Sequence, residues 1–371
     1  MSPRLQHPHH SEQAQQHALI ALLTSICQVP APTFAEQARA AFIAQLWQEY
    51  GLSPQRDETG NVVVDLPGGQ GPRVLLAAHL DTVFSADTDV HVRSEGRYLC
   101  APGIGDNSAS LAVLSYYLQG LEQQRQPRPR LSIAATVGEE GLGDLYGMRA
   151  LMEARAEDFD MVIAVDGHLG IVVNASVGSR RHHISIDAPG GHSWGDYPSP
   201  SAVHALGDMV HALGEMHIPN DPRSSYNVGE IGGGTSINAI AQQAHFNLDL
   251  RSLDEDVLQQ LEHNALRAIA RVAEAHGVRY ESKQVGRRPA AKVDNQLLVR
   301  AAQASLRSLQ LPARLTASST DANAAMAAGL PAIAFGVYQG GDAHRLSEWL
   351  EPTSLLSGYQ ALVSLLAQLS R

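Results

Sequence analysis

Apolar and polar residues alternate with the periodicity of helices in the first part of the chain. In two segments the apolar residues recur every three or four positions and so form a stripe along one side of a helix. These two stripes predict two successive helices near the N-terminus. Thr33 and Glu36 have the spacing of a capping box, so we expect the second helix to begin there. The stripe residues are Leu19, Leu22, Leu23 and Ile26 in the first helix, and Ala35, Ala38, Phe42 and Leu46 in the second.

Short continuous apolar runs follow, and their lengths are typical of strands. Helical stretches such as residues 108–118 separate them. Continuous apolar strands that alternate with helices are characteristic of a parallel sheet covered by helices on both faces. The pattern therefore predicts an α/β domain with a mostly parallel sheet. The runs are residues 61–66, 73–81, 131–140, 160–168 and 331–337.

The pattern changes from about Asn174. Segments such as HHISIDAPG and AHFNLDLRS alternate apolar with polar residues, as strands do when one face of their sheet meets water. Helical stretches at 201–213 and 254–276 accompany them. We expect a small α+β domain of four strands and two helices at 175–286. It would be inserted into a larger, discontinuous domain made of 1–174 and 287–371.

Composition and net charge exclude several classes of protein and of binding partner. A chain of 371 residues exceeds what one core usually organises, and its 44% hydrophobic content excludes broad disorder. The net charge of −11 repels nucleic acid and anionic lipid, so we expect neither partner. The N-terminal sequence is polar and His-rich, without the apolar core of a signal peptide, and no apolar run is long enough to span a membrane. We therefore expect a cytoplasmic protein.

The chemistry-bearing residues gather where the predicted strands end. Ligands bind outside the carboxyl ends of strands in open α/β sheets, so these side chains should meet. Clustered carboxylates repel one another unless cations compensate, and two cysteines, Cys27 and Cys100, cannot supply a thiolate site. Imidazole and carboxylate ligands suit two zinc ions, with cobalt or manganese as alternatives. The residues are His79, Asp81, Asp106, Glu139, Glu140, Asp166 and His344.

Six motifs resemble one known family, the co-catalytic zinc hydrolases. This family includes peptidase T, bacterial glutamate carboxypeptidase, aminoacylase, acetylornithine deacetylase and succinyl-diaminopimelate desuccinylase. The resemblance spans nearly the whole chain and implies that the inserted domain is a dimerisation or lid domain. The motifs are AAHLDTV, GIGDN, TVGEEG, AVDG, GGHS and AHRLSEW, in that order along the chain.

The resemblance implies a role for each residue at the strand ends. His79, Asp106 and Asp166 would hold one zinc ion, and Asp106, Glu140 and His344 would hold the other. Asp81 would orient His79, because a carboxylate on the far ring nitrogen fixes the tautomer. Glu139 would be the general base, which takes a proton from water and passes it to the leaving amine.

The family resemblance also implies roles for three residues of the inserted domain. His192 of the GGHS motif would reach the active site of a partner subunit in a homodimer and bind the developing oxyanion. Asn238 and Arg251 would bind the substrate backbone and carboxylate. The chain departs from many family members at Asn107 and Ser108, where a second acid or a lysine often follows the bridging aspartate.

Two other classes of function compete with this interpretation. Residues 191–195 fit G-x-S-x-G, the nucleophile elbow of serine hydrolases, with Ser193 as nucleophile and Asp321 and His344 following. An elbow needs a helix directly afterwards, and the prolines at 198 and 200 disfavour one. A binding module without catalysis is the other class, and it would have no use for Glu139 beside the ligands.

The substrate depends on pocket walls that motifs do not define. Hydrolysis of a short peptide and deacylation of an N-acyl amino acid use the same metals and the same base. The segment GEEGLGDLYGMRAL is closer to peptidase T, so we favour a small peptide over an N-acyl amino acid.

Overall fold

The computed structural model describes residues 11–121 and 126–370, so the first ten residues of the His-rich N-terminal segment lie outside the described part. The chain divides into two compact units, one of Met1–Asn174 with Val293–Arg371 and one of Ala175–Lys292. The sequence pattern places the second boundary at residue 286. In the structure the small unit continues, because the N–H groups of Ala290 and Ala291 bind its Glu255 and Ser176.

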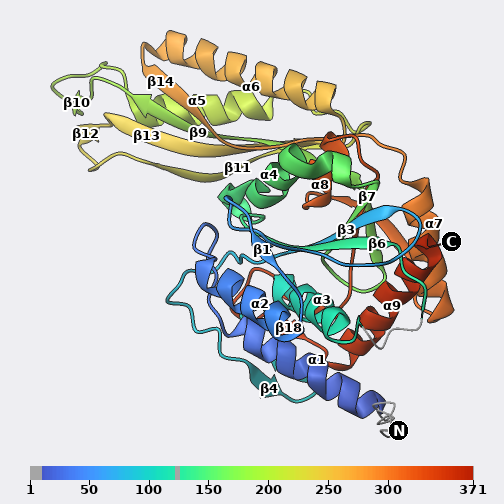
Figure 1. The fold of residues 1–371 in the computed structure, drawn as a ribbon. Helices are drawn as coiled ribbons and strands as arrows, with labels where there is room; N and C mark the ends of the chain where they lie inside the picture. The colour runs from blue at the N-terminus through green and yellow to red at the C-terminus, as the bar shows by residue number, and fades with distance from the viewer. Residues whose placement is uncertain (1–10, 122–125, 371) are drawn as a thin grey trace, which may run out of the picture. The chain divides into compact units, whose positions relative to one another are not determined.

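The large unit is built around an eight-stranded sheet (Figure 1). Its four central strands, β6, β3, β7 and β16, are parallel. Strand β2 pairs with β6 in antiparallel orientation on one side of them, and β8 pairs with β16 in antiparallel orientation on the other. Across the sheet the order is β1 (Gln55–Arg56), β2 (Val62–Asp65), β6 (Arg130–Thr136), β3 (Arg73–His79), β7 (Met161–Val165), β16 (Ala332–Phe335), β8 (Ile171–Ser176) and β15 (Arg314–Ser318).

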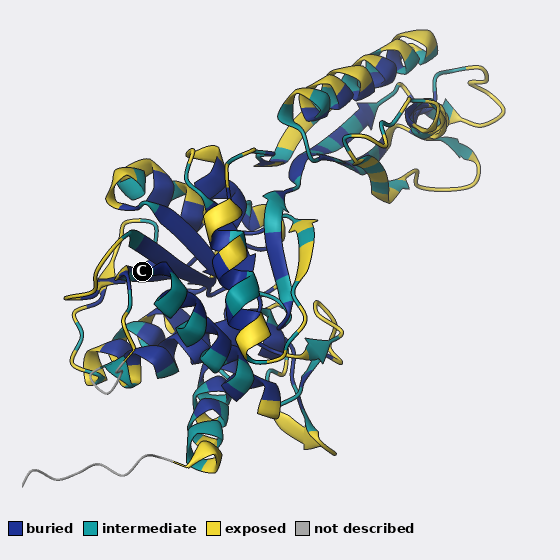
Figure 2. Ribbon diagram, turned by 90° about the vertical axis from the view of Figure 1, so that its right-hand side faces the viewer, coloured by how far each residue is buried: buried dark blue, intermediate teal, exposed yellow. Residues whose placement is uncertain are grey.

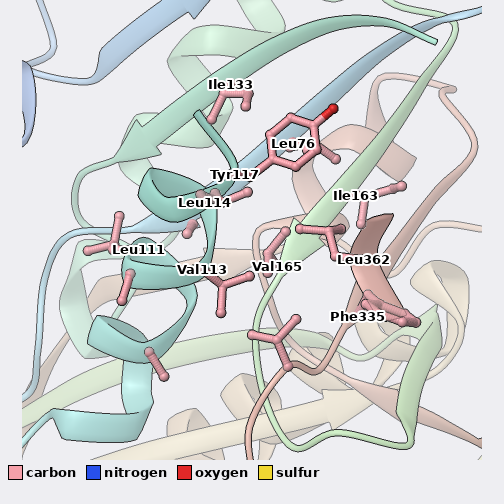
Figure 3. Close-up of a cluster of buried hydrophobic side chains, with 14 of the residues drawn as sticks. Leu76, Leu111, Val113, Leu114, Tyr117, Ile133, Ile163, Val165, Phe335 and Leu362 are labelled. Atoms are coloured by element: carbon pink, nitrogen blue, oxygen red, sulfur yellow. The ribbon is translucent and has the colours of Figure 1, made fainter. Parts of the chain in front are cut away.

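Helices cover both faces of this sheet, as Figure 1 shows. On one face lie α1 (Glu12–Cys27), α2 (Gln37–Glu49), α3 (Ser110–Gln119), α7 (Gln296–Ser308) and α9 (Thr353–Leu369), and on the other α4 (Tyr146–Arg155) and α8 (Ala322–Ala327). The apolar sides of α3 and α9 pack on the sheet, and their residues Leu114 and Leu362 belong to the same buried cluster as Leu76 and Ile163 of the strands (Figure 3). Burial is concentrated on the sheet and on the inner faces of the helices (Figure 2).

Short elements at the edge of the large unit carry loops of interest. A small sheet joins β17 (Gly340–Gly341), β18 (Trp349–Leu350), β5 (Tyr98–Cys100) and β4 (Arg93–Glu95). Residues 342–348 form the loop between β17 and β18. Single helical turns are present at η1 (Ile104–Ala109), η3 (Gly141–Gly143) and η4 (Ala156–Asp158).

The small unit has one antiparallel sheet in the order β11 (Ser224–Gly233), β13 (Gln243–Ser252), β9 (Gly178–Asp187) and β14 (Arg279–Arg288). Helices α5 (Ala202–Gly214) and α6 (Glu255–His276) pack on one face, where every second residue of β13 is buried, including Phe246 and Leu248. A two-stranded ribbon joins β10 (Gly191–His192) to β12 (Ala239–Ile240). The predicted fold class, a mostly parallel α/β sheet with a separate four-stranded α+β unit, is confirmed.

The prediction for the start of the second helix is wrong. Helix α2 begins at Gln37 without a side-chain cap, because Thr33 and Glu36 form hydrogen bonds elsewhere in the unit. The apolar stripe is also rotated: Ala35 and Ala38 are exposed. The residues that α2 buries are Arg39, Ala40, Ile43 and Trp47.

The helices described here include none that is both long and apolar enough to cross a bilayer.

Candidate metal centre

Adjacent parallel strands bring the candidate ligands to one edge of the large sheet. His79 is the last residue of β3, Glu140 follows β6, and Asp166 follows β7. Because these three strands are neighbours and run in the same direction, their carboxyl ends lie together. Two loops complete the group, with Asp106 in η1 and His344 between β17 and β18.

Asp106 lies at the centre of this group. Its Oδ1 is 3.0 Å from Nε2 of His79, and its Oδ2 is 3.1 Å from Nε2 of His344. Nε2 of His344 is also 2.9 Å from Oε1 of Glu140. Each oxygen of Asp106 therefore faces a different imidazole, which is the arrangement of a carboxylate that bridges two ions.

The donor atoms form two overlapping groups of three. One consists of His79, Asp106 and Asp166, and the other of Asp106, Glu140 and His344, with the donor atoms of each within 4.8 Å of one another. A third group, of His79, Glu139 and Glu140, overlaps both. Nitrogen and carboxylate oxygen without sulfur fit zinc, cobalt or manganese.

The electrostatics of the group favour added positive charge. Burial, followed by repulsion from Asp106, raises the pKa of Asp166 to about 7. Burial alone would also raise the pKa of Asp106, but the hydrogen bonds with His344 and His79 outweigh it and lower this pKa. Hydrogen bonds to Asp106 and Glu140 raise the pKa of His344 to about 10. Protonated imidazoles thus offset the negative charge of the carboxylates. Bound metal ions would provide the same positive charge in their place.

Asp81 connects His79 to the segment of the two glutamates. Its Oδ1 and Oδ2 accept the backbone N–H groups of Glu139 and Glu140, each at 2.9 Å, and Oδ2 also accepts the hydroxyl of Thr33 at 2.9 Å. Nδ1 of His79 is 3.0 Å from the backbone oxygen of Asp81 and 3.5 Å from its carboxylate. The side chain of Asp81 therefore lies beside His79 and also fixes the loop that carries Glu139.

Sequence reasoning missed Glu348, which is buried four positions after His344. Its Oε2 accepts the N–H of Gly103 at 2.8 Å, and its Oε1 accepts those of Gly105 and Asp106 at 2.8 and 2.9 Å. Burial raises the pKa of Glu348 to about 7, although the three N–H donors act in the opposite direction. The sequence feature that could have revealed Glu348 is its place in the AHRLSEW motif, where it is the acidic residue.

Arg39 was also missed, because an arginine in a helix usually points to solvent. It is fully buried and donates hydrogen bonds to the carbonyl groups of Val29, Leu80 and Cys27. Leu80 stands between His79 and Asp81, so Arg39 anchors the backbone at the end of β3.

In the small unit, His192 and Asn238 lie close together. Strand β10 pairs His192 with Ala239, and the N–H of Ser193 donates to the backbone oxygen of Asn238 at 3.0 Å. Nδ1 of the exposed His192 accepts the N–H groups of Trp194 and Gly195, both at 3.2 Å. A neutral ring whose Nδ1 accepts must carry its proton on Nε2, which leaves that N–H available as a donor.

Arg251 is in another part of the small unit, near the end of β13. Its Nε donates to Oδ2 of Asp249 at 2.6 Å. Arg251 is therefore not grouped with His192 and Asn238.

The geometry required of a serine nucleophile elbow is absent around Ser193 in the described chain. The residues after Ser193 form turns, and the next helix, α5, begins only at Ala202. The other two candidates are engaged elsewhere, since Asp321 accepts the hydroxyl of Thr136 at 2.6 Å and His344 contacts Asp106 and Glu140.

Residues 75–368 match the peptidase family M20/M25/M40. A Pyrococcus abyssi protein named as a LysW-lysine/LysW-ornithine hydrolase is 33% identical over 37% of this chain and 37% of its own length. The Escherichia coli cytosol non-specific dipeptidase is 24% identical over 65% of this chain and 55% of its own. The Vibrio cholerae acetylornithine deacetylase is 27% identical over 56% and 59%. The chain thus spans from about a third to three fifths of these relatives.

Solved structures share the fold over nearly the whole chain. Aminopeptidase PepT from Bacillus cereus has a TM-score of 0.80 at 21% identity and covers 96% of this chain and 99% of its own. A tripeptidase from Staphylococcus aureus has a TM-score of 0.82 at 22% identity, with the same coverage. The Bacillus subtilis YXEP protein, described as a dinuclear metal-binding peptidase, has a TM-score of 0.70 at 17% identity over 96% and 98%.

Proposed function

Because the chain belongs to the peptidase family M20/M25/M40, we propose that it hydrolyses the amide bond of short peptides at a dinuclear metal centre. The observation that carries the proposal is the position of Asp106, whose two oxygens face two different histidines. This geometry supports His79, Asp106 and Asp166 as ligands of one ion and Asp106, Glu140 and His344 as ligands of the other. When bound, two zinc ions would supply Lewis acidity to the scissile carbonyl and make water a stronger acid.

Glu139 is the general base in this proposal. Its backbone N–H is held by Asp81, next to the ligand Glu140, so its position is fixed relative to the ligands. The carboxylate takes a proton from the attacking water and transfers it to the leaving nitrogen when the amide bond breaks. One group thereby serves first as base and then as acid.

His192 provides the donor for the developing oxyanion. With Nδ1 occupied by two backbone N–H groups, the Nε2–H is free to bind an oxygen that gains negative charge. We further propose that the chain forms a homodimer through the small unit, whose sheet ends in β11 and β14, and that His192 serves the partner subunit's site. Asn238, beside His192, would bind the substrate backbone, and Arg251 would need to exchange Asp249 for a substrate carboxylate.

Short peptides are the favoured substrates. The fold is shared with an aminopeptidase and a tripeptidase, and the sequence is related to a dipeptidase named as cytosolic, which also supports a cytoplasmic location. The relationship to an acetylornithine deacetylase favours N-acyl amino acids as the second candidate. Zinc is the metal we propose, and cobalt or manganese would satisfy the same donors.

A substrate panel tests the proposal. Protein loaded separately with zinc, cobalt and manganese is assayed against di- and tripeptides and against N-acetyl and N-succinyl amino acids. We expect cleavage of peptides at the highest kcat/KM and loss of activity after chelation. Preference for N-acyl amino acids would support the second candidate, and full activity after thorough chelation would exclude a metal hydrolase.

A further inference from the structure

The residues just before helix α2 are bound to the loop that carries Glu139. The hydroxyl of Thr33 donates to Asp81, and Oε1 of Glu36 accepts the N–H groups of both Phe34 and Gly138, each at 2.9 Å. Glu36 is almost completely buried. The position of Phe34 is therefore fixed relative to Gly138, the residue that precedes Glu139.

Two aromatic side chains flank this point without entering the core. The rings of Phe34 and Tyr146 meet edge to face with centroids 6.0 Å apart, and we call them the aromatic pair. A Cβ added at Gly138 would lie 3.1 Å from the Cβ of Tyr146 and 3.6 Å from the ring of Phe34. The backbone N–H of Tyr146 also donates to the oxygen of Gly138 at 3.0 Å. The aromatic pair is thus built onto the loop of the proposed base.

The exposure of the aromatic pair has no explanation in the packing of the unit. Phe34 is 57% exposed and Tyr146 is 50% exposed. Phe34 also has a φ of 68°, a left-handed conformation that is unfavourable for a bulky residue. Unfavourable backbone conformations that the surroundings enforce are concentrated at functional sites. At Phe34 this conformation accompanies the hydrogen bond from its N–H to Glu36, and the ring lies beside Gly138, the residue before Glu139.

We propose that the aromatic pair is a specificity subsite. It binds a bulky apolar side chain on one of the two residues that the scissile amide bond joins. This inference rests on the proposed function and narrows its substrate class to amides with a leucine-like or aromatic side chain at that position. Contact with two rings removes apolar surface from water, and this gain is larger for a leucine side chain than for alanine.

Selectivity measurements test the subsite. Phe34→Gly removes the ring at a position where glycine is free of backbone strain, so the fold should be retained. Tyr146→Ala removes the second ring, and Tyr146→Phe retains it. Leu297→Ala is the matched control, because Leu297 is 54% exposed on α7 in the same unit. For each variant, kcat/KM is measured with peptide pairs that carry leucine or alanine on either side of the cleaved bond.

We expect the leucine-to-alanine ratio of kcat/KM to fall by about 5–20-fold in Phe34→Gly and Tyr146→Ala, because a hydrophobic contact discriminates by roughly this factor. The ratio should be unchanged in Tyr146→Phe and Leu297→Ala. An unchanged ratio in both ring-deletion variants would overturn the proposal. This includes an equal fall in kcat/KM for the leucine and alanine substrates, which leaves their ratio unchanged.

A binding measurement separates failure of the subsite from failure of the proposed function. Leucine and alanine hydroxamates are titrated calorimetrically into the zinc-loaded wild-type protein and the same variants. If no amide is hydrolysed, the proposed function fails, and the ratio of the two hydroxamate affinities still decides the subsite. Tighter binding of leucine hydroxamate that is lost in Phe34→Gly supports it, and equal binding in all variants overturns it.

Discussion

Glu348 accepts a hydrogen bond of 2.9 Å from the backbone N–H of Asp106, which lies 242 positions earlier in the chain. The same carboxylate binds the N–H groups of Gly103 and Gly105. One buried side chain thereby fixes the segment that presents Asp106 to both histidines. The loop between β17 and β18 thus provides His344 and also holds Asp106 in place.

Replacing Glu348 should weaken both the fold and the metal centre. Glu348→Ala leaves three N–H groups without their acceptor, and since an unpaired buried donor costs about 1–3 kcal/mol, we expect the free energy of unfolding to fall by at least about 3 kcal/mol. Glu348→Gln should lose less, because its carbonyl oxygen can still accept from two donors. Urea unfolding and calorimetric zinc titration measure the two effects. Wild-type zinc affinity in the alanine variant would contradict a positioning role.

Removal of single ligands should change the metal content in steps. Wild-type protein should bind two zinc ions per chain, Asp166→Ala one, and Asp106→Ala fewer than one, because Asp106 belongs to both of the groups proposed to hold an ion. Elemental analysis after dialysis against low zinc gives the numbers. Equal losses in the two variants would argue against Asp106 as the bridge.

Glu139→Gln should separate catalysis from metal binding. The amide is nearly isosteric but cannot accept a proton, and general bases contribute typically about 10²–10⁴-fold, so turnover should fall by that factor. Metal content and unfolding should stay as in wild type. A variant that retains more than about a tenth of wild-type kcat would show that Glu139 is not the base.

His192→Ala should lower turnover by about 10²–10³-fold and leave the metals bound, because an oxyanion donor acts mainly in the transition state. Mixing this variant with Glu139→Gln tests action across subunits. Random re-pairing should restore activity to about a quarter of wild type, since half of the dimers are mixed and each of these has one complete site. Sedimentation of the protein as a monomer, or no recovery despite subunit exchange, would refute action in trans.

Glu36 should make stability depend on pH. Burial raises its pKa above the ordinary 4.5, against the opposing effect of the N–H groups of Phe34 and Gly138. The folded protein therefore binds this proton more tightly than the unfolded chain, so the stabilisation is complete below about pH 4.5 and is lost as pH rises through the folded pKa. Glu36→Gln retains the accepting oxygen but does not titrate.

The measurement is urea unfolding of both proteins across pH 4–7. The free energy of unfolding of wild type minus that of Glu36→Gln should decrease as pH rises. Glu153→Gln, an exposed position on α4, is the control and should show a constant difference. A wild-type advantage that grows with pH would mean that the pKa of Glu36 is lowered.

Periodicity and strand-end chemistry predicted much of this protein. The apolar runs at 73–81 and 160–168 contain β3 and β7, because a strand buried on both faces must be apolar throughout. The resemblance to the co-catalytic zinc hydrolases is confirmed at the level of the family. The candidate ligands could be recognised because the turn after each of these strands interrupts an apolar pattern with acids or histidine.

Tertiary partners explain what the sequence did not reveal. Thr33 and Glu36 have the local spacing of a cap, but Thr33 donates to the distant Asp81, and Glu36 accepts the N–H of the distant Gly138 as well as that of Phe34. Arg39 and Glu348 are charged residues whose burial is favourable only because backbone groups from distant segments surround them. No local pattern contains that information.

The contact between Ser176 and Ala291 affects how this architecture can evolve. The hydroxyl of Ser176 donates to the backbone oxygen of Ala291 and accepts the N–H of the same residue, so the outgoing and returning segments of the small unit are joined where they begin and end. An inserted module whose two ends meet can be lengthened, exchanged or deleted by recombination without rerouting the host sheet. Descendants of this chain could therefore acquire a different accessory module while keeping the same host sheet.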